Sequence, residues 1–122
     1  ESLDMALVLI VEDSSFQRKI IIQIIEKAGH KTLATENGKK GLEVLEANTP
    51  DCIFCDLLMP EMDGFEFLAA LKAKNISIPV INLTSDIQDT VKQKCLDLGA
   101  KGFLNKPAQE PQILAALNSV LS

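Results

Sequence analysis

The most informative segment of this sequence is Asp51-Cys52-Ile53-Phe54-Cys55-Asp56-Leu57-Leu58-Met59-Pro60-Glu61-Met62-Asp63-Gly64. Mostly apolar residues lead to the carboxylate of Asp56, and Pro60 and Gly64 then bracket an acidic turn before a new apolar run. This pattern predicts a buried strand that reaches the surface at Asp56. Strands buried on both faces are typical of parallel sheets covered by helices, in which ligands bind beyond the carboxyl ends of the strands. Asp56 is therefore a candidate site residue.

Patterns on both sides of this segment predict five strands that alternate with five helices. The predicted strands are residues 6–11, 31–35, 52–55, 80–84 and 102–105. Each of the five predicted helices carries apolar residues at helical spacing. In chain order these are Phe16, Ile20, Ile21, Ile24, Ile25 and Ala28 in the first helix; Leu42, Val44 and Leu45 in the second; Phe65, Leu68 and Leu71 in the third; Val91, Cys95 and Leu98 in the fourth; and Ile113, Leu114, Leu117, Val120 and Leu121 in the fifth. This alternation predicts a doubly wound α/β domain.

Length and composition predict one soluble domain, residues 1–122, located in the cytoplasm. The chain has 122 residues, of which 47% are hydrophobic and 24% charged. Residues at the start of the sequence do not form a basic segment followed by an apolar signal core, and no apolar run approaches the roughly 20 residues that cross a membrane. Residues 1–5 carry no pattern, and we expect a disordered or artificial end there. The net charge of −5 argues against direct binding of nucleic acid, because that affinity comes from clustered Lys and Arg.

The pair Cys52 and Cys55 has the spacing of a redox dithiol, but its position favours buried structural thiols. A reactive dithiol normally begins a helix, where the helix dipole stabilises the thiolate. This pair lies in a predicted strand, where residues three apart face opposite sides. Cys95, on the apolar face of a later helix, is also expected to be buried.

Polar residues follow the predicted strands at the points where they end, namely Glu12 and Asp13, Asp56, Thr84, and Lys106. Each alone has an ordinary explanation, such as capping a helix or placing a solvated charge at an edge. The carboxyl ends of neighbouring parallel strands converge on one crevice, however. Together these residues therefore predict a site.

Three carboxylates in one crevice require cations. If they lie about 5 Å apart, each pair repels by roughly 3 kcal/mol at an effective dielectric constant of about 20. Lys106 and one divalent metal would balance the charge, and all-oxygen ligands suit Mg²⁺ or Mn²⁺ rather than zinc. A metal, a lysine and a hydroxyl are also the groups that neutralise a phosphoryl group. Asp56 is the candidate acceptor, because carboxylates form acyl phosphates and the chain has one His and no glycine-rich phosphate loop.

Four motifs of the sequence resemble a known family. They are Leu9-Ile10-Val11-Glu12-Asp13, Cys55-Asp56-Leu57-Leu58-Met59-Pro60-Glu61-Met62-Asp63-Gly64, Leu83-Thr84-Ser85 and Lys106-Pro107. In this order and spacing, and over essentially the whole chain, they resemble the response-regulator receiver domain of two-component signalling. The resemblance implies a flavodoxin-like sheet with strand order 2-1-3-4-5, and phosphorylation of Asp56 by a histidine kinase or a histidine phosphotransfer protein. It also implies a signalling domain, not an enzyme, that changes conformation to regulate a partner or output domain.

The resemblance also implies roles for individual residues. Mg²⁺ would be held by Glu12, Asp13, Asp56 and the backbone carbonyl of Leu58, the phosphoryl oxygens would be contacted by Thr84 and Lys106, and the conformational switch would consist of Thr84 and Phe103. The Lys106–Pro107 bond would be cis, a state that proline alone makes accessible. The output partner would bind the face formed by the fourth helix, the fifth strand and the fifth helix.

Four further positions complete the comparison with the family. Leu58 and Asp86 occupy variable positions that tune the lifetime of the phosphate. Ser85 stands where the family often has Ala, which affects packing around the phosphoryl group. His30 follows a predicted helix end, so we expect it to cap that helix rather than to donate phosphate.

Three other classes of protein fit parts of the pattern. A flavin-binding protein of this architecture would need Tyr or Trp to stack on the ring, and the chain has neither. An aspartyl phosphatase usually has a second Asp two residues after the first, where this chain has Leu58. The main alternative is a receiver-fold interaction module that is not phosphorylated, although no site residue of the family is missing.

Overall fold

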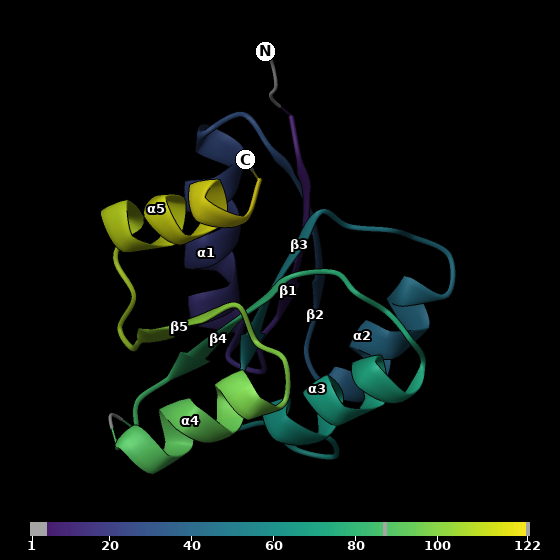
Figure 1. Ribbon diagram of the computed structural model, residues 1–122. Helices are drawn as coiled ribbons and strands as arrows, with labels where there is room; N and C mark the ends of the chain where they lie inside the picture. The colour runs from purple at the N-terminus through teal and green to yellow at the C-terminus, as the bar shows by residue number, and fades with distance from the viewer. Residues whose placement is uncertain (1–4, 87, 122) are drawn as a thin grey trace.

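The computed structural model describes residues 5–86 and 88–121, in which five strands alternate with five helices (Figure 1). The strands are β1 (Leu7–Val11), β2 (Lys31–Thr35), β3 (Cys52–Asp56), β4 (Val80–Thr84) and β5 (Gly102–Asn105). The helices are α1 (Ser15–Lys27), α2 (Gly38–Leu45), α3 (Gly64–Ala73), α4 (Asp89–Asp97) and α5 (Glu110–Leu121). The prediction for residues 1–5 lies outside the described residues, apart from Met5, which is exposed.

The strands form one parallel sheet in the order β2-β1-β3-β4-β5, which confirms the predicted flavodoxin-like α/β fold. Helices α1 and α5 cover one face, and α2, α3 and α4 cover the other (Figure 1). β3 and β4 are buried at every position because helices lie on both sides, whereas the edge strand β2 is partly exposed. No helix in the described ranges is long and apolar enough to cross a membrane.

Alternate residues of the strands build two hydrophobic cores, one on each face of the sheet. Cys55 belongs to the core under α3, and Cys52 to the core under α1 and α5. The two thiols therefore face opposite sides, as predicted. Burial raises the pKa of Cys52 to about 12 and raises the pKa of Cys55 well above its ordinary value. A redox dithiol is excluded, and Cys95 is likewise buried with a raised pKa.

The end of α1 is closed by the backbone of His30. Gly29 adopts φ of 99°, which a residue without Cβ reaches without strain. The N–H of His30 donates to the carbonyl of Ile25 at 3.3 Å, which closes the last turn. The imidazole has another partner, because its Nδ1 accepts from the N–H of Ala6 at 3.0 Å. The predicted capping role is thus confirmed for the backbone of His30 and not for its side chain.

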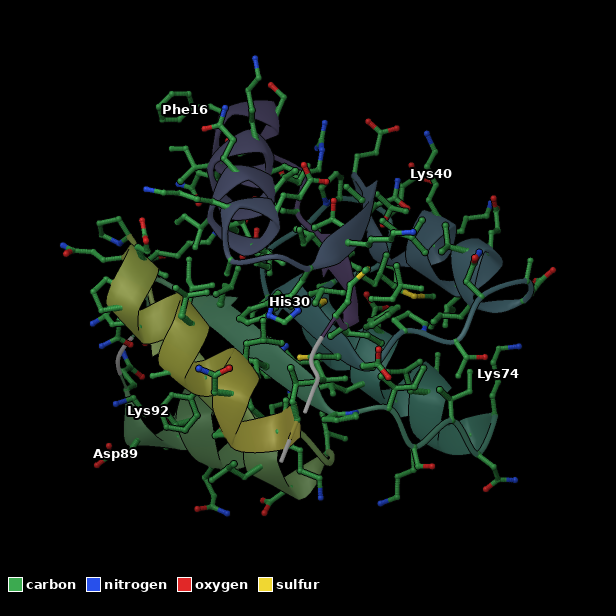
Figure 2. The ribbon with its side chains drawn as sticks, turned by 90° about the horizontal axis from the view of Figure 1, so that it is seen from above. Phe16, His30, Lys40, Lys74, Asp89 and Lys92 are labelled. Atoms are coloured by element: carbon green, nitrogen blue, oxygen red, sulfur yellow. The ribbon has the colours of Figure 1, made fainter. Side chains whose placement is uncertain are left out.

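Two apolar residues that helical spacing assigns to the core face of α1 are exposed. Phe16 is 72% exposed and Ile20 is 37% exposed, whereas Ile21 and Ile25 are buried. Phe16 lies in the first turn of α1 and points away from the body of the protein (Figure 2). The periodicity locates the buried side of the helix but overestimates its width. The same error applies to Leu121 in α5, which is 37% exposed.

Candidate functional site

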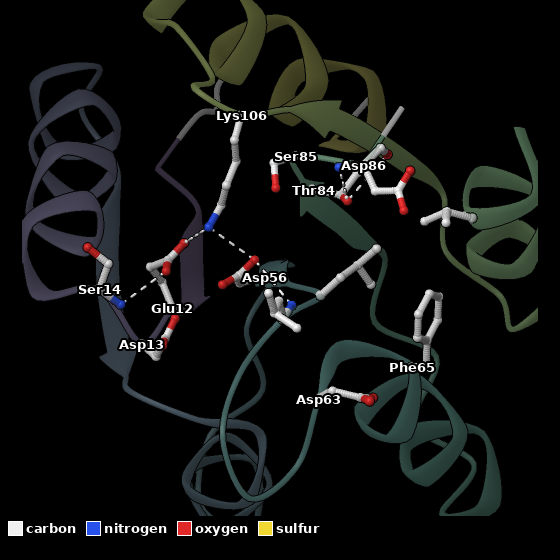
Figure 3. A pocket seen from close by; sticks show the side chains of 13 residues that line it. Glu12, Asp13, Ser14, Asp56, Asp63, Phe65, Thr84, Ser85, Asp86 and Lys106 are labelled. Atoms are coloured by element: carbon white, nitrogen blue, oxygen red, sulfur yellow. Dashed lines mark hydrogen bonds and ion pairs between the residues drawn. The ribbon is translucent and has the colours of Figure 1, made fainter. Parts of the chain in front are cut away.

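Carboxylates from two neighbouring strands lie together where the strands end (Figure 3). Glu12 and Asp13 directly follow β1, and Asp56 is the last residue of the paired strand β3. Each offers a carboxylate oxygen, and these atoms lie within 4.8 Å of one another, close to the separation expected from the sequence. Glu12 and Asp56 are buried and Asp13 is exposed. The predicted cluster therefore exists and is open to solvent on one side.

Lys106 lies between the two buried carboxylates. Its Nζ is 2.9 Å from Glu12 Oε1 and 3.0 Å from Asp56 Oδ1 (Figure 3). Burial raises the pKa of both carboxyl groups, and their contacts with Lys106 offset this only in part. Burial by itself would lower the pKa of Lys106, but the two carboxylates outweigh it and raise that pKa. The Lys106–Pro107 peptide bond is cis, as predicted.

The turn that carries Glu12 and Asp13 is held by the start of α1. The N–H of Ser14 donates to Glu12 Oε2 at 3.1 Å, and its hydroxyl caps α1 by accepting from the N–H of Gln17. Arg18 donates from Nη1 to the carbonyl of Glu12 at 2.7 Å. Sequence reasoning missed Arg18, because the charges on a helix do not reveal which of them reaches back to the backbone.

The loop between β3 and α3 is packed closely behind Asp56. A Cβ at position 64 would lie 2.6 Å from the carbonyl oxygen of Asp56, so Gly64 leaves room for the strand end. The N–H of Gly64 also donates to the carbonyl of Leu57 at 2.9 Å. Asp63 and Glu66 cap the first turn of α3 reciprocally, each side chain accepting from the other's N–H. The loop is thus fixed at both ends.

Thr84 is buried at the end of β4, and its hydroxyl is engaged with the following loop. Thr84 Oγ1 accepts from the N–H of Asp86 at 3.0 Å, and the dashed lines from Thr84 lead to Asp86 in Figure 3. Phe103 is half-buried in β5 and does not line the pocket around Asp56. In this structure, Lys106 is therefore the cationic partner of Asp56, and contact from Thr84 to a group on Asp56 stays a prediction.

The carboxylates lie in an open pocket of about 440 Å³. Leu58 and Asp86 line it and are exposed, and the N–H of Leu58 donates to Asp56 Oδ1 at 3.4 Å. Phe65 and Val91 add an apolar wall on the side of α3 and α4. Both residues also pack against the core on this face of the sheet, as helical spacing predicts, but the spacing does not reveal that they line a pocket as well.

The donor set fits a hard divalent cation. Three carboxylates face the single ammonium of Lys106, which leaves an excess of negative charge. Glu12 Oε1 is buried and, apart from the ion pair with Lys106, has no hydrogen-bond donor in good geometry among residues 5–86 and 88–121. The cluster offers oxygen ligands, which Mg²⁺ and Mn²⁺ prefer. The residues present are thus suited to the kind of ion that the sequence predicted.

Comparison with known proteins agrees with this geometry. The family described as "Response regulator receiver domain" matches residues 8–118. Protein PilH of Pseudomonas aeruginosa is 36% identical over 120 residues, which cover 97% of this chain and 99% of PilH. A protein-glutamate methylesterase/protein-glutamine glutaminase of Treponema denticola is 42% identical over 120 residues, 94% of this chain. The chain spans only 32% of the length of that relative.

The structural comparison leads to the same family. The chemotaxis response regulator CheY4 of Vibrio cholerae superposes with a TM-score of 0.90 at 32% identity, over 97% of this chain and all of CheY4. The chemotaxis protein CheY of Bacillus subtilis is 34% identical over 116 residues, which are 94% of this chain and 97% of that protein. The chain therefore belongs to the family of response regulator receiver domains.

Proposed function

We propose that Asp56 accepts a phosphoryl group from the phosphohistidine of a histidine kinase or a histidine phosphotransfer protein. The observation that carries this proposal is the setting of Asp56 at the end of β3. Its carboxylate is buried beside Glu12 and Asp13, has the Nζ of Lys106 at 3.0 Å, and faces an open pocket. Membership of the receiver family supports the same role.

In the proposed reaction, a carboxylate oxygen of Asp56 bonds to phosphorus as the P–N bond to the donor imidazole breaks. The imidazole leaves with the electron pair of that bond, and the product is an acyl phosphate. Lys106 would neutralise one phosphoryl oxygen, and the hydroxyl of Thr84 would donate to another. The chain contributes position and charge to a single transfer, so we infer a signalling domain rather than an enzyme.

A Mg²⁺ ion, or Mn²⁺ in its place, would be held by Glu12, Asp13, Asp56 and the backbone carbonyl of Leu58. When bound, it would supply positive charge opposite the phosphoryl oxygens. Ser14 and Arg18 would keep the turn after β1 in place through their contacts with Glu12. Leu58 and Asp86 are exposed at the pocket, and we infer that they tune the lifetime of the phosphate by controlling the access of water.

The proposed output is a change in the face formed by α4, β5 and α5. Thr84 would turn from Asp86 toward the phosphoryl group, and Phe103 on the neighbouring strand would move into the space that Thr84 leaves. We infer that a protein partner or an output domain recognises this face. The net charge of −5 supports a protein partner rather than nucleic acid.

Intact-mass spectrometry after incubation with Mg²⁺ and acetyl or carbamoyl phosphate tests the proposal. The wild-type protein should gain one phosphoryl group, and the matched variant Asp56→Asn should gain none. Asp13→Asn should need more Mg²⁺ to reach the same fraction of adduct. An equal adduct on Asp56→Asn would contradict the assignment of the acceptor. A wild-type protein that forms no adduct with either donor would instead favour the unphosphorylated interaction module.

A further inference from the structure

Lys92 of α4 lies over the aromatic ring of Phe103 in β5. Its Nζ is 5.1 Å from the ring centroid, within the roughly 6 Å over which a cation is attracted by the face of a ring. Both residues are half-buried, so the pair is shielded from water in part. Figure 2 shows Lys92 in the part of the molecule where α4 and α5 lie. The contact therefore joins α4 directly to β5.

The surroundings make this contact important for the position of Phe103. Phe103 is paired with Asn82 of β4, and Asn82 and Thr84 point to the same face of the sheet, the face that α4 covers. Asn82 is fully buried, and its amide donates to the carbonyl of Cys55 at 3.2 Å. The amide oxygen of Asn82 has no hydrogen-bond partner among the described residues. The β4 neighbour of Phe103 is thus a polar side chain, and the ring has a favourable cation on its α4 side.

The helix that carries Lys92 packs on the core through Cys95 and through Val91 and its C-cap Leu98, which are only partly buried. Cys95 is its one buried residue within the described chain, and Gln88 at its N-terminus makes no side-chain cap. A second lysine, Lys94, lies over the ring of Phe65 in α3 at 4.2 Å from the centroid. The two cation–π contacts therefore tie one helix to two different aromatic rings, of which only Phe103 belongs to the proposed switch.

We propose that Lys92 is a positioning residue that holds the ring of Phe103 in its resting place and so limits the fraction of molecules that have switched. The inference rests on the proposed function, in which Phe103 moves when Thr84 turns toward the phosphoryl group. An exposed to half-buried cation–π pair has the strength to change a two-state equilibrium about two- to fivefold. Loss of the Lys92 ammonium should raise the switched fraction by this factor.

The test uses ring ¹H–¹³C NMR spectra of protein that contains ¹³C-labelled phenylalanine, with Lys92→Gln, Lys92→Arg and the matched control Lys94→Gln. In the unphosphorylated protein, Lys92→Gln should move the Phe103 signals toward their positions in the beryllofluoride-bound state, and Lys92→Arg should restore them. Lys94→Gln removes the same charge from the same helix and should move the signals of Phe65 instead.

Unchanged Phe103 signals in Lys92→Gln, or equal changes in Lys94→Gln, would overturn the proposal. A shift away from the beryllofluoride-bound position would do the same, because Lys92 would then favour the switched state. Failure of the proposed function has a different signature, since beryllofluoride would then move no Phe103 signal in the wild-type protein. The comparison of Lys92→Gln with Lys94→Gln in the resting protein still decides whether Lys92 positions the ring.

Discussion

Helices α3 and α4 cover the same face of the sheet and follow strands that end at the same pocket, but they are attached differently. α3 begins with the capping box of Asp63 and Glu66 and buries Phe67, Leu68 and Leu71. Within the described residues, α4 begins without a side-chain cap and buries Cys95 alone. Free energies of local opening vary across a structure with burial and capping of this kind. We therefore expect α4 to shift at lower cost than α3.

The difference in packing between α3 and α4 matches the two steps of the proposed function, which are transfer of the phosphoryl group to Asp56 and transmission of the signal to a partner. The loop before α3 carries the backbone behind Asp56, which has to stay in one place for group transfer. The strand before α4 carries Thr84, whose proposed turn has to be passed on to a partner. A firmly packed helix such as α3 suits phosphoryl transfer, and a less firmly packed helix such as α4 suits transmission of the signal. A change on the side of α3 should therefore affect stability differently from a matched change on the side of α4 and β5.

The largest expected difference comes from removing a leucine side chain from each helix. Leu68→Ala in α3 should destabilise the fold by about 3 kcal/mol, because Leu68 is 2% exposed and the change leaves a cavity. Leu96→Ala in α4 should cost about 1 kcal/mol or less, because Leu96 is 43% exposed. Urea unfolding of both variants measures the difference. Equal losses would mean that α4 is packed as firmly as α3.

A smaller difference is expected when a methyl group is added to a glycine on each side. Gly64→Ala should destabilise the protein by about 2 kcal/mol, because the new Cβ would lie 2.6 Å from the carbonyl oxygen of Asp56. Gly102→Ala in β5 should change stability by less than about 1 kcal/mol, since no described residue other than its chain neighbours lies within 4 Å of its Cβ position. Thermal unfolding gives both values. If Gly64→Ala left the stability unchanged, the loop behind Asp56 would have moved to make room for the methyl group, which would contradict a rigid loop.

The smallest individual effects are expected at the helix caps, with opposite signs in the two helices. Asp63→Ala should cost about 1 kcal/mol, because it removes the hydrogen bond that Asp63 accepts from Glu66 N–H at 2.8 Å. Gln88→Ser should stabilise the protein by up to about 1 kcal/mol, since Gln88 has extended backbone dihedrals and its side chain caps no N–H of the described part of the chain. Amide hydrogen exchange of the first turns of α3 and α4 locates each effect. A Gln88→Ser variant with unchanged exchange in α4 would contradict the role given to the missing cap.

Much of the architecture follows from the sequence because parallel strands leave a strong local signature. The predicted strands at residues 31–35, 80–84 and 102–105 coincide with β2, β4 and β5. A mostly apolar run marks β4, and Gly29 and Gly99, which follow α1 and α4, show where β2 and β5 can begin. The clustering of Glu12, Asp13 and Asp56 is equally accessible, because the end of every parallel strand points to the same edge of the sheet.

The directions of individual side chains could not be predicted from the sequence. Periodicity places Phe16 on the core face of α1, but the first turn of this helix leaves it exposed. A threonine at a strand end does not show whether its hydroxyl faces Asp56 or the N–H of Asp86. No pattern predicts that Lys92 covers Phe103, because that contact depends on how α4 is rotated against the sheet. Rotations of this kind are set by packing and not by local sequence.

Beryllofluoride is a mimic of the phosphoryl group. Amide NMR spectra recorded with and without it test most directly whether β5 and α4 transmit the signal from Asp56. We expect shift changes that run from Thr84 through Phe103 into α4, that leave most amide signals of α3 unchanged, and that are attenuated in Thr84→Ala. Changes confined to the loops around Asp56, or as large in α3 as in α4, would contradict this expectation.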